Sequence, residues 1–297
     1  MDILTTAVQA FLNGIFEGSV YAILGLGLTL MFGVMRILNL ASGALVISAA
    51  FLSYWLLQLL GIDPYLSIPI VLVSFFALGI CIAKGVVEVS MSSPQYQIVG
   101  TVMVTYGLAL LIENIEVIAW KANYRALTPP AYLPTSISIA GVMINTIRLS
   151  SLIITVAVAV GFTFLLKTRF GTAMRACTQN REMAGVMGVN YQSISAITFG
   201  IAAALGGIAG VLYGLTELVN PYSGMMLTIK GLTVAVLGGL GSFYGALLAG
   251  FVLGLAESFG VLFVSAAYKD LIGFVILIVI LLLSPGGLSR KEFYTPT

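Results

Sequence analysis

The sequence has 297 residues, of which 60% are hydrophobic and only 8% are charged, and its formal net charge is +2. Soluble domains carry about 25% charged residues, so this composition, with a mean hydropathy of +1.10, indicates an integral membrane protein. The small net charge excludes nucleic acid as a partner. There is no histidine and only two cysteines, Cys81 and Cys177, so neither a metal site nor another cofactor is expected.

Long uncharged stretches occupy most of the chain, and a membrane helix needs roughly 20 apolar residues. These stretches predict about eight to ten transmembrane helices. Backbone groups in lipid must be satisfied internally, and no period-two alternation runs through the stretches, so we expect an all-α membrane protein, a polytopic helical bundle. The stretches cover residues 18–35, 37–62, 64–83, 89–112, 149–166, 183–216, 231–256 and 271–289.

The cations set the expected orientation, because Lys and Arg concentrate in cytoplasmic loops. With the segment 167–190 inside the cell, the chain makes nine passes and its N-terminus lies outside. The cations expected inside are Arg36, Lys84, Lys167, Arg169, Arg175, Arg181, Arg290 and Lys291. Those expected outside are Lys121, Arg125, Arg148, Lys230 and Lys269.

Two interruptions fall inside apolar stretches. Residues 39–44 read Asn-Leu-Ala-Ser-Gly-Ala, and residues 237–246 read Leu-Gly-Gly-Leu-Gly-Ser-Phe-Tyr-Gly-Ala. Glycine costs about 1 kcal/mol in a helix interior, and helix breaks in matching places of two halves indicate a transport site. We therefore expect discontinuous helices there. The residues assigned to the translocation pathway are Asn39, Ser42, Gly43, Gly239 and Gly241.

Five glutamates lie in or beside apolar spans, where a charge at the bilayer centre costs about 2.5 to 3.5 kcal/mol. Glu17 and Glu257 are also assigned to the pathway, the alternative being that neighbouring backbone or a partner subunit satisfies them. Glu113 and Glu116 are expected at the level of the lipid headgroups. Glu217, just before Asn-Pro-Tyr at 220–222, is expected in an external turn.

Two polar segments are candidate docking surfaces. Within residues 167–190, the part from Arg175 to Gly188 predicts a short amphipathic helix that can dock in a groove of a partner, with Arg175 and Glu182 on one side and Met183 and Met187 on another. The external residues 121–148 contain three prolines and are expected to form an ordered ledge for an extracytoplasmic partner. For both segments the alternative is a plain connection.

Several motifs carry a family resemblance. Glu182, Ala184 and Gly188 form a Glu-x-Ala-x3-Gly pattern that resembles the coupling loop of ABC importer permeases. Together with motifs recurring in order along nearly the whole chain, it resembles the branched-chain amino acid ABC transporter permeases, in particular the first of the two paired permease subunits. The other motifs lie at residues 21–29, 32–34, 171–177, 188–190, 220–221, 237–242, 245–246 and 284–288.

The resemblance implies one transmembrane permease domain over residues 1–297 that is not itself an enzyme. It implies a multi-pass protein of a bacterial or archaeal inner membrane that imports branched-chain or other hydrophobic amino acids. The implied partners are two ATP-binding cassette ATPases, a second permease subunit, an extracytoplasmic substrate-binding protein and membrane lipid. The coupling residues would be Arg175, Glu182, Ala184 and Gly188.

Two departures from the family leave the solute open. Where relatives usually read Asn-Phe-Ala-His-Gly-Glu, residues 39–44 carry Ser42 and Ala44 in place of the histidine and the glutamate. Glu17 also occupies a position that is commonly apolar. The alternatives are a permease for urea, short amides or another small solute, or an ion-coupled secondary transporter whose proton site is Glu17 or Glu257. A membrane-embedded enzyme is disfavoured, because histidine, a metal-binding group and an aspartate pair are all missing from the sequence.

Overall fold

The computed structural model describes residues 3–92, 97–127, 136–139, 142–265, 268–284 and 286–288. Helices dominate these residues, and one two-stranded sheet accompanies them. The elements are α1 (Ile3–Met35), α2 (Ser42–Leu60), α3 (Pro64–Ser92), α4 (Gln97–Trp120), β1 (Ser136–Ile139), β2 (Val142–Asn145), α5 (Thr146–Lys167), α6 (Arg169–Gln179), α7 (Arg181–Val186), α8 (Tyr191–Thr216), the 3-10 turn η1 (Pro221–Ser223), α9 (Gly224–Gly238), α10 (Phe243–Phe263) and α11 (Lys269–Leu283).

Among the described residues, seven helices are long and apolar enough to cross a membrane, namely α1, α2, α3, α4, α5, α8 and α10. The apolar helices α9 and α11 have 15 residues each, or about 22 Å, which is less than the thickness of the hydrocarbon core. The protein is therefore a multi-pass membrane protein. The prediction of an all-α polytopic bundle is confirmed.

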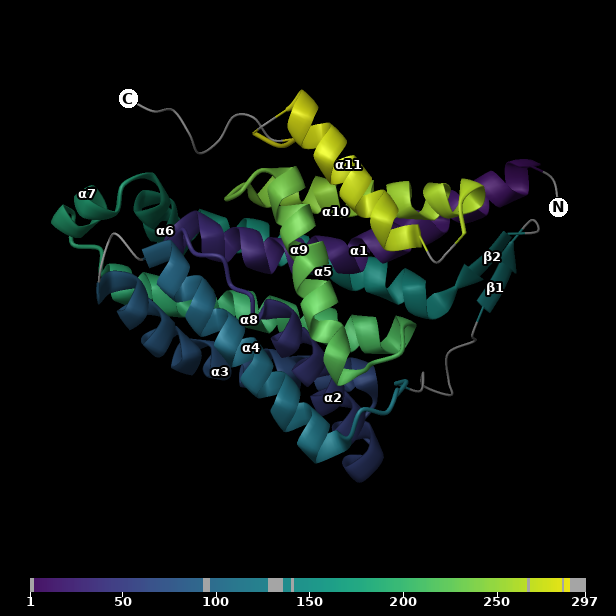
Figure 1. Cartoon of the computed structure of the whole chain (residues 1–297), viewed down its shortest axis with the longest axis horizontal. Helices are drawn as coiled ribbons and strands as arrows, with labels where there is room; N and C mark the ends of the chain where they lie inside the picture. Colours follow the sequence, from purple (N-terminus) through teal and green to yellow (C-terminus); the bar gives the residue numbers. More distant parts are fainter. Residues whose placement is uncertain are drawn as a thin grey trace.

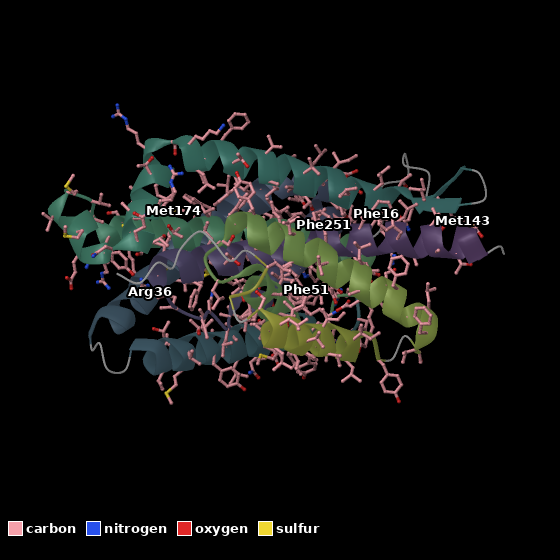
Figure 2. The ribbon with its side chains drawn as sticks, turned by 90° about the horizontal axis from the view of Figure 1, so that it is seen from above. Phe16, Arg36, Phe51, Met143, Met174 and Phe251 are labelled. Carbon is pink, nitrogen blue, oxygen red and sulfur yellow. The ribbon has the colours of Figure 1, made fainter. Side chains whose placement is uncertain are left out.

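The bundle has two distinct ends (Figure 1). Helices α6 and α7 stand at one end and the β1–β2 hairpin at the other. Arg36 and Met174 lie at the α6–α7 end, whereas Met143 lies at the hairpin end (Figure 2). The N-terminus also lies at the hairpin end, so α1 runs from that end towards α6 and α7.

Helices α1 and α8 form the centre of the bundle. In their most apolar stretches 89% and 72% of the residues are buried, against 17% in both α4 and α5, which face outward. Helix α9 crosses the others at a steep angle (Figure 1) and packs on α1, α2 and α10. This crossing helix brings Lys230 into the interior, with only 13% of its side chain exposed. The expectation that Lys230 lies in an outside loop is therefore wrong.

Glycines let α1 and α10 approach closely. A Cβ atom on Gly254 would lie less than 3 Å from backbone atoms of Gly14 and Gly18, and one on Gly250 would meet the backbone of Ala22 in the same way. Small residues at spacings of four are the usual means of close contact between membrane helices. The α1–α10 pair is therefore fixed by backbone contact, and it carries Glu17 on α1 and Glu257 on α10.

The external segment 121–148 forms in part the ordered structure that was expected. β1 pairs antiparallel with β2, from Ser136 opposite Asn145 to Ile139 opposite Val142. The Asn145 side chain then accepts hydrogen bonds from the amides of Ile147 and Arg148 and so caps α5. Pro129, Pro130 and Pro134, like Arg290 and Lys291 at the C-terminal end, lie outside the described residues.

Candidate functional site

A cavity of about 630 Å³ opens at the hairpin end of the bundle. Its walls come from the middle of α1, the C-terminal end of α8, and the starts of α5, α9 and α11. Polar and charged lining residues include Glu17, Tyr21, Arg148, Glu217, Lys230, Lys269 and Asp270. The apolar ones include Phe16, Val20, Met226 and Leu227. A cavity of this size and mixed lining is typical of a site for a small organic molecule.

Lys230 lies at the centre of one group of charges at this cavity. Its ammonium lies 3.2 Å from a carboxylate oxygen of Glu257 and 2.9 Å from one of Asp270, and it donates to the Tyr21 hydroxyl at 2.7 Å. Tyr21 in turn donates to Glu257 at 2.9 Å. Glu257 is 1% exposed, and buried carboxylates of this kind require such partners. The group ties α1, α9, α10 and α11 together.

Glu17 belongs to a second group, beside the first. One of its oxygens lies 2.6 Å from the ammonium of Lys269, and the other lies 3.7 Å from the guanidinium of Arg148. Lys269 also lies 4.0 Å from Glu257, so the two groups are joined. The structure therefore joins Glu17 and Glu257, both assigned to the pathway by sequence, through Lys269, although only Glu17 lines the cavity itself.

The first helix break, after Arg36, lies deeper in the bundle. The Gly43 amide donates to the Thr228 hydroxyl at 2.9 Å, and the Leu40 amide donates to the Thr105 hydroxyl at 3.2 Å. Asn39 is 1% exposed and accepts from the Ala41 amide. Side chains of neighbouring helices thus satisfy the unwound backbone, as membrane depth requires.

A pocket of only about 20 Å³ remains beside this break, lined by Asn39, Ser42 and Gly43. Val20 lines the large cavity, and Leu24 and Leu28 line the small pocket. Residues four apart lie on one face of a helix, so the cavity and the pocket lie on the same face of α1. Leu227 lines both. In this conformation the break is closed off from the cavity.

The second break connects α9 to α10 at the α6–α7 end. Gly239 and Gly241 have φ values of 93° and 90°, in the left-handed region that glycine tolerates. Ser242 then caps α10 by accepting from the Gly245 amide. Gly241 lines a separate cavity of about 340 Å³ on the opposite face of α1, together with Arg175. The predicted discontinuous helices are present, and their two breaks border different cavities on opposite faces of α1.

The segment 167–190 differs from the expected single helix, because it forms two short helices. Asn180 ends α6 in an extended conformation and caps α7, accepting from the amides of Glu182 and Met183 at 3.0 Å each. Arg175 therefore lies on α6 and Glu182 on α7, both exposed. An Asn side chain competes with helical backbone hydrogen bonds, which explains the break.

Helix α7 presents an apolar surface away from the bundle. Met183, Val186 and Met187 are 63%, 81% and 83% exposed. Ala184 is buried at 4%, and the guanidinium of Arg181 lies 3.8 Å from the centre of the Tyr191 ring. Gly188, at φ 84°, ends the helix. The segment is thus anchored on its inner side and open on its outer side.

Several contacts between polar side chains in the interior were not predicted from the sequence. Glu116, expected at headgroup level, is 1% exposed, and Ser48 of α2 donates to it at 2.5 Å. Lys230 is the lone cation in the apolar residues 224–238, and this isolation was the available signal for a buried partner. Within the described residues, no group of three or more His, Cys, Asp or Glu side chains gathers that could hold a metal ion.

Comparison with known proteins agrees with this architecture. Residues 10–281 match the family described as "Branched-chain amino acid transport system / permease component". The chain is 33% identical to the high-affinity branched-chain amino acid transport system permease protein BraD of Pseudomonas aeruginosa and 32% identical to LivH of Escherichia coli, in each case over 96% of both chains. It is 25% identical to a probable LivH of Methanocaldococcus jannaschii, over 95% of this chain and 92% of that one.

No solved structure gives a significant match. The sequence relationships extend from the first membrane helix into α11 and include the glycine turn between α9 and α10 and the α6–α7 segment. The chain therefore belongs to the family of permease components of branched-chain amino acid transport systems.

Proposed function

We propose that this chain is a permease subunit of an ATP-driven importer that takes up branched-chain amino acids or similar small apolar amino acids across a bacterial or archaeal inner membrane. Its partners are two ATPase subunits, a second permease subunit and an extracytoplasmic substrate-binding protein. The solute class comes from BraD and LivH, which are named as permease proteins of branched-chain amino acid transport systems.

The observation that carries the proposal is the exposed apolar surface of α7. Val186 and Met187 project from a helix that is flanked by Arg175, Arg181 and other cations, so this surface lies outside the lipid. Exposed apolar side chains rimmed by polar ones are typical of a protein-binding surface. An ATPase groove that covers α7 would transmit its closure through α6 and α8, on which α7 is anchored.

Solute would enter at the opposite end. The cavity beside Glu17 and Glu257 would receive it from the binding protein, and Leu227 together with the Asn39–Gly43 break would separate the cavity from the far side until the ATPases close. Gly239 and Gly241 would allow α9 and α10 to change their angle at the second break. Transport then follows alternating access around a closed midsection.

The test uses the complete transporter in proteoliposomes, with ATP inside and loaded binding protein outside. Replacing Met187 with Glu should lower stimulated ATP hydrolysis and leucine uptake at least tenfold and weaken co-purification of the ATPases. Met143→Glu is the matched control, since Met143 is 64% exposed at the hairpin end and should retain ATPase co-purification and basal hydrolysis. Normal coupling in the Met187 variant, or no ATP-driven leucine uptake by the unmodified transporter, would reject the proposal.

A further inference from the structure

The charges that line the large cavity do not all have partners. Arg148, Lys230 and Lys269 are paired with Glu17, Asp270 and the buried Glu257 in five ion pairs. These three cations and three carboxylates neutralise one another. Glu217 also lines the cavity, is exposed, and makes no ion pair with any residue that the structure describes. Glu257 packs on Lys230 behind the cavity wall and does not line the cavity itself. Among the carboxylates that line the cavity, Glu217 is therefore the one without an ion-pair partner in the described residues.

The backbone around Glu217 adds to this negative potential. Glu217 is the residue that caps the C-terminus of α8, where its amide donates to the Tyr213 carbonyl. The C-terminal end of a helix carries a partial negative charge and stabilises cations. The carboxylate and the helix end thus act on the cavity with the same sign.

The position of Glu217 is fixed before any solute arrives. Two residues further on, Val219 and Arg125 exchange a pair of backbone hydrogen bonds of 2.8 and 2.9 Å. Next to them, the Asn220 side chain donates to the Ala122 carbonyl at 2.9 Å. A charge held by such contacts binds a ligand without the entropic cost of ordering a loop.

The rest of the lining suits an alkylammonium group. Tyr124, Tyr213 and Tyr222 line the same cavity, and tyrosine rings attract ammonium groups through their π faces. Phe16, Val20 and Met226 provide an apolar wall for an aliphatic chain. We propose that Glu217 binds the ammonium group of the incoming solute, with the aliphatic part of the solute against this apolar wall.

The identification of that solute as an amino acid rests on the proposed function, whereas the ammonium site itself rests on the cavity. An anionic solute that lacks an ammonium group should be repelled by the unpaired carboxylate of Glu217. Leucine and two analogues, each lacking one of its charged groups, therefore separate the contribution of the ammonium group to binding from that of the carboxylate. 3-Methylbutylammonium retains the ammonium group and lacks the carboxylate, while 4-methylpentanoate retains the carboxylate and lacks the ammonium group.

The experiment measures equilibrium binding of these three radiolabelled probes to the purified complete transporter without its binding protein. We expect L-leucine and 3-methylbutylammonium to bind and 4-methylpentanoate not to bind at the same concentration. Glu217→Gln, an exposed substitution, should weaken binding of both ammonium probes at least tenfold. Glu113→Gln is the control, since it removes the same charge from α4 outside the cavity lining and should leave both affinities unchanged.

The inference is overturned if Glu217→Gln binds 3-methylbutylammonium as tightly as the unmodified transporter, or if Glu113→Gln weakens it equally. The proposed function is tested separately by ATP-driven uptake of leucine. Glu217-dependent binding of the amine without leucine uptake would support the site and reject the function. Leucine uptake, together with ammonium-probe binding that is unchanged in Glu217→Gln, would support the function and reject the site.

Discussion

The ammonium of Lys230 on α9 lies 3.2 Å from the carboxylate of Glu257 on α10, and the Tyr21 hydroxyl on α1 contacts both. Three helices thus share one buried ionic contact. In a buried pair, the attraction between the charges is offset by the cost of removing both from water. The loss of one partner is therefore more damaging than the loss of both.

The first prediction follows from this asymmetry. Lys230→Met should lower the free energy of unfolding by about 3 to 5 kcal/mol, because Glu257, which is 1% exposed, loses its closest cation. Lys230→Met combined with Glu257→Gln should recover at least half of that loss. Unfolding of the purified permease in mixed detergent micelles measures both. A double variant no more stable than the single one would show that the pair is not the cause.

The second prediction concerns the contact between α1 and α10. Gly254→Ala places a methyl group less than 3 Å from the backbone of Gly14 and Gly18, which can only be relieved by separating the helices. We expect a loss of about 1 to 3 kcal/mol, the usual cost of overpacking. Gly161→Ala in α5 is the control, because nothing lies within 4 Å of its Cβ position. Equal stability of the two variants would contradict the close contact.

The helix breaks show how far the sequence predicts the fold. Residues 39–44 and 237–246 indicated interruptions because asparagine, serine and clustered glycine are unfavourable in an apolar helix, and both interruptions are present. The hydroxyls that satisfy the first break belong to Thr105 and Thr228, 65 and 185 residues away from the amides they bind. A threonine in an apolar span carries no signal of such a partner.

The candidate site was predictable only in part for a similar reason. Glu17 and Glu257 were recognisable as carboxylates in apolar spans, and the structure joins them through Lys269 beside the cavity that Glu17 lines. Lys230 was assigned to a loop because it is a cation. Composition alone does not show that the residues around it form a helix that crosses the bundle at a steep angle. The pairing of Glu116 with Ser48 likewise depends on how α2 and α4 pack.

The third prediction concerns the turn that ends α7. Gly188 has a φ of 84°, and the next amide, of Val189, donates to the Ala184 carbonyl at 3.0 Å. A β-branched residue is strained at this φ although no atom lies within 4 Å of its Cβ position, so Gly188→Val should unwind the turn. Stimulated ATP hydrolysis by the complete transporter should fall at least fivefold. Gly185→Ala is the control, because the space around its Cβ position is equally open and its φ is not positive, and this variant should retain stimulated hydrolysis. Equal losses in both variants would show that the conformation of the turn at Gly188 is not the cause.

The last prediction uses thiol labelling to locate the α6–α7 end. Cys177 is 4% exposed, and burial raises the pKa of its thiol although Arg181 opposes this. Because the thiolate is the nucleophile that attacks a maleimide, Cys177 should react slowly at pH 7 and faster as the pH rises towards that raised pKa.

Met187→Cys, at a position 83% exposed, should instead react rapidly at pH 7 with a membrane-impermeant maleimide. In a Cys177→Ser background this labelling should occur in inverted vesicles and not in intact cells, since the surrounding cations belong on the cytoplasmic side. Rapid labelling of Met187→Cys from outside intact cells would reverse the orientation and remove α7 from the reach of an ATPase.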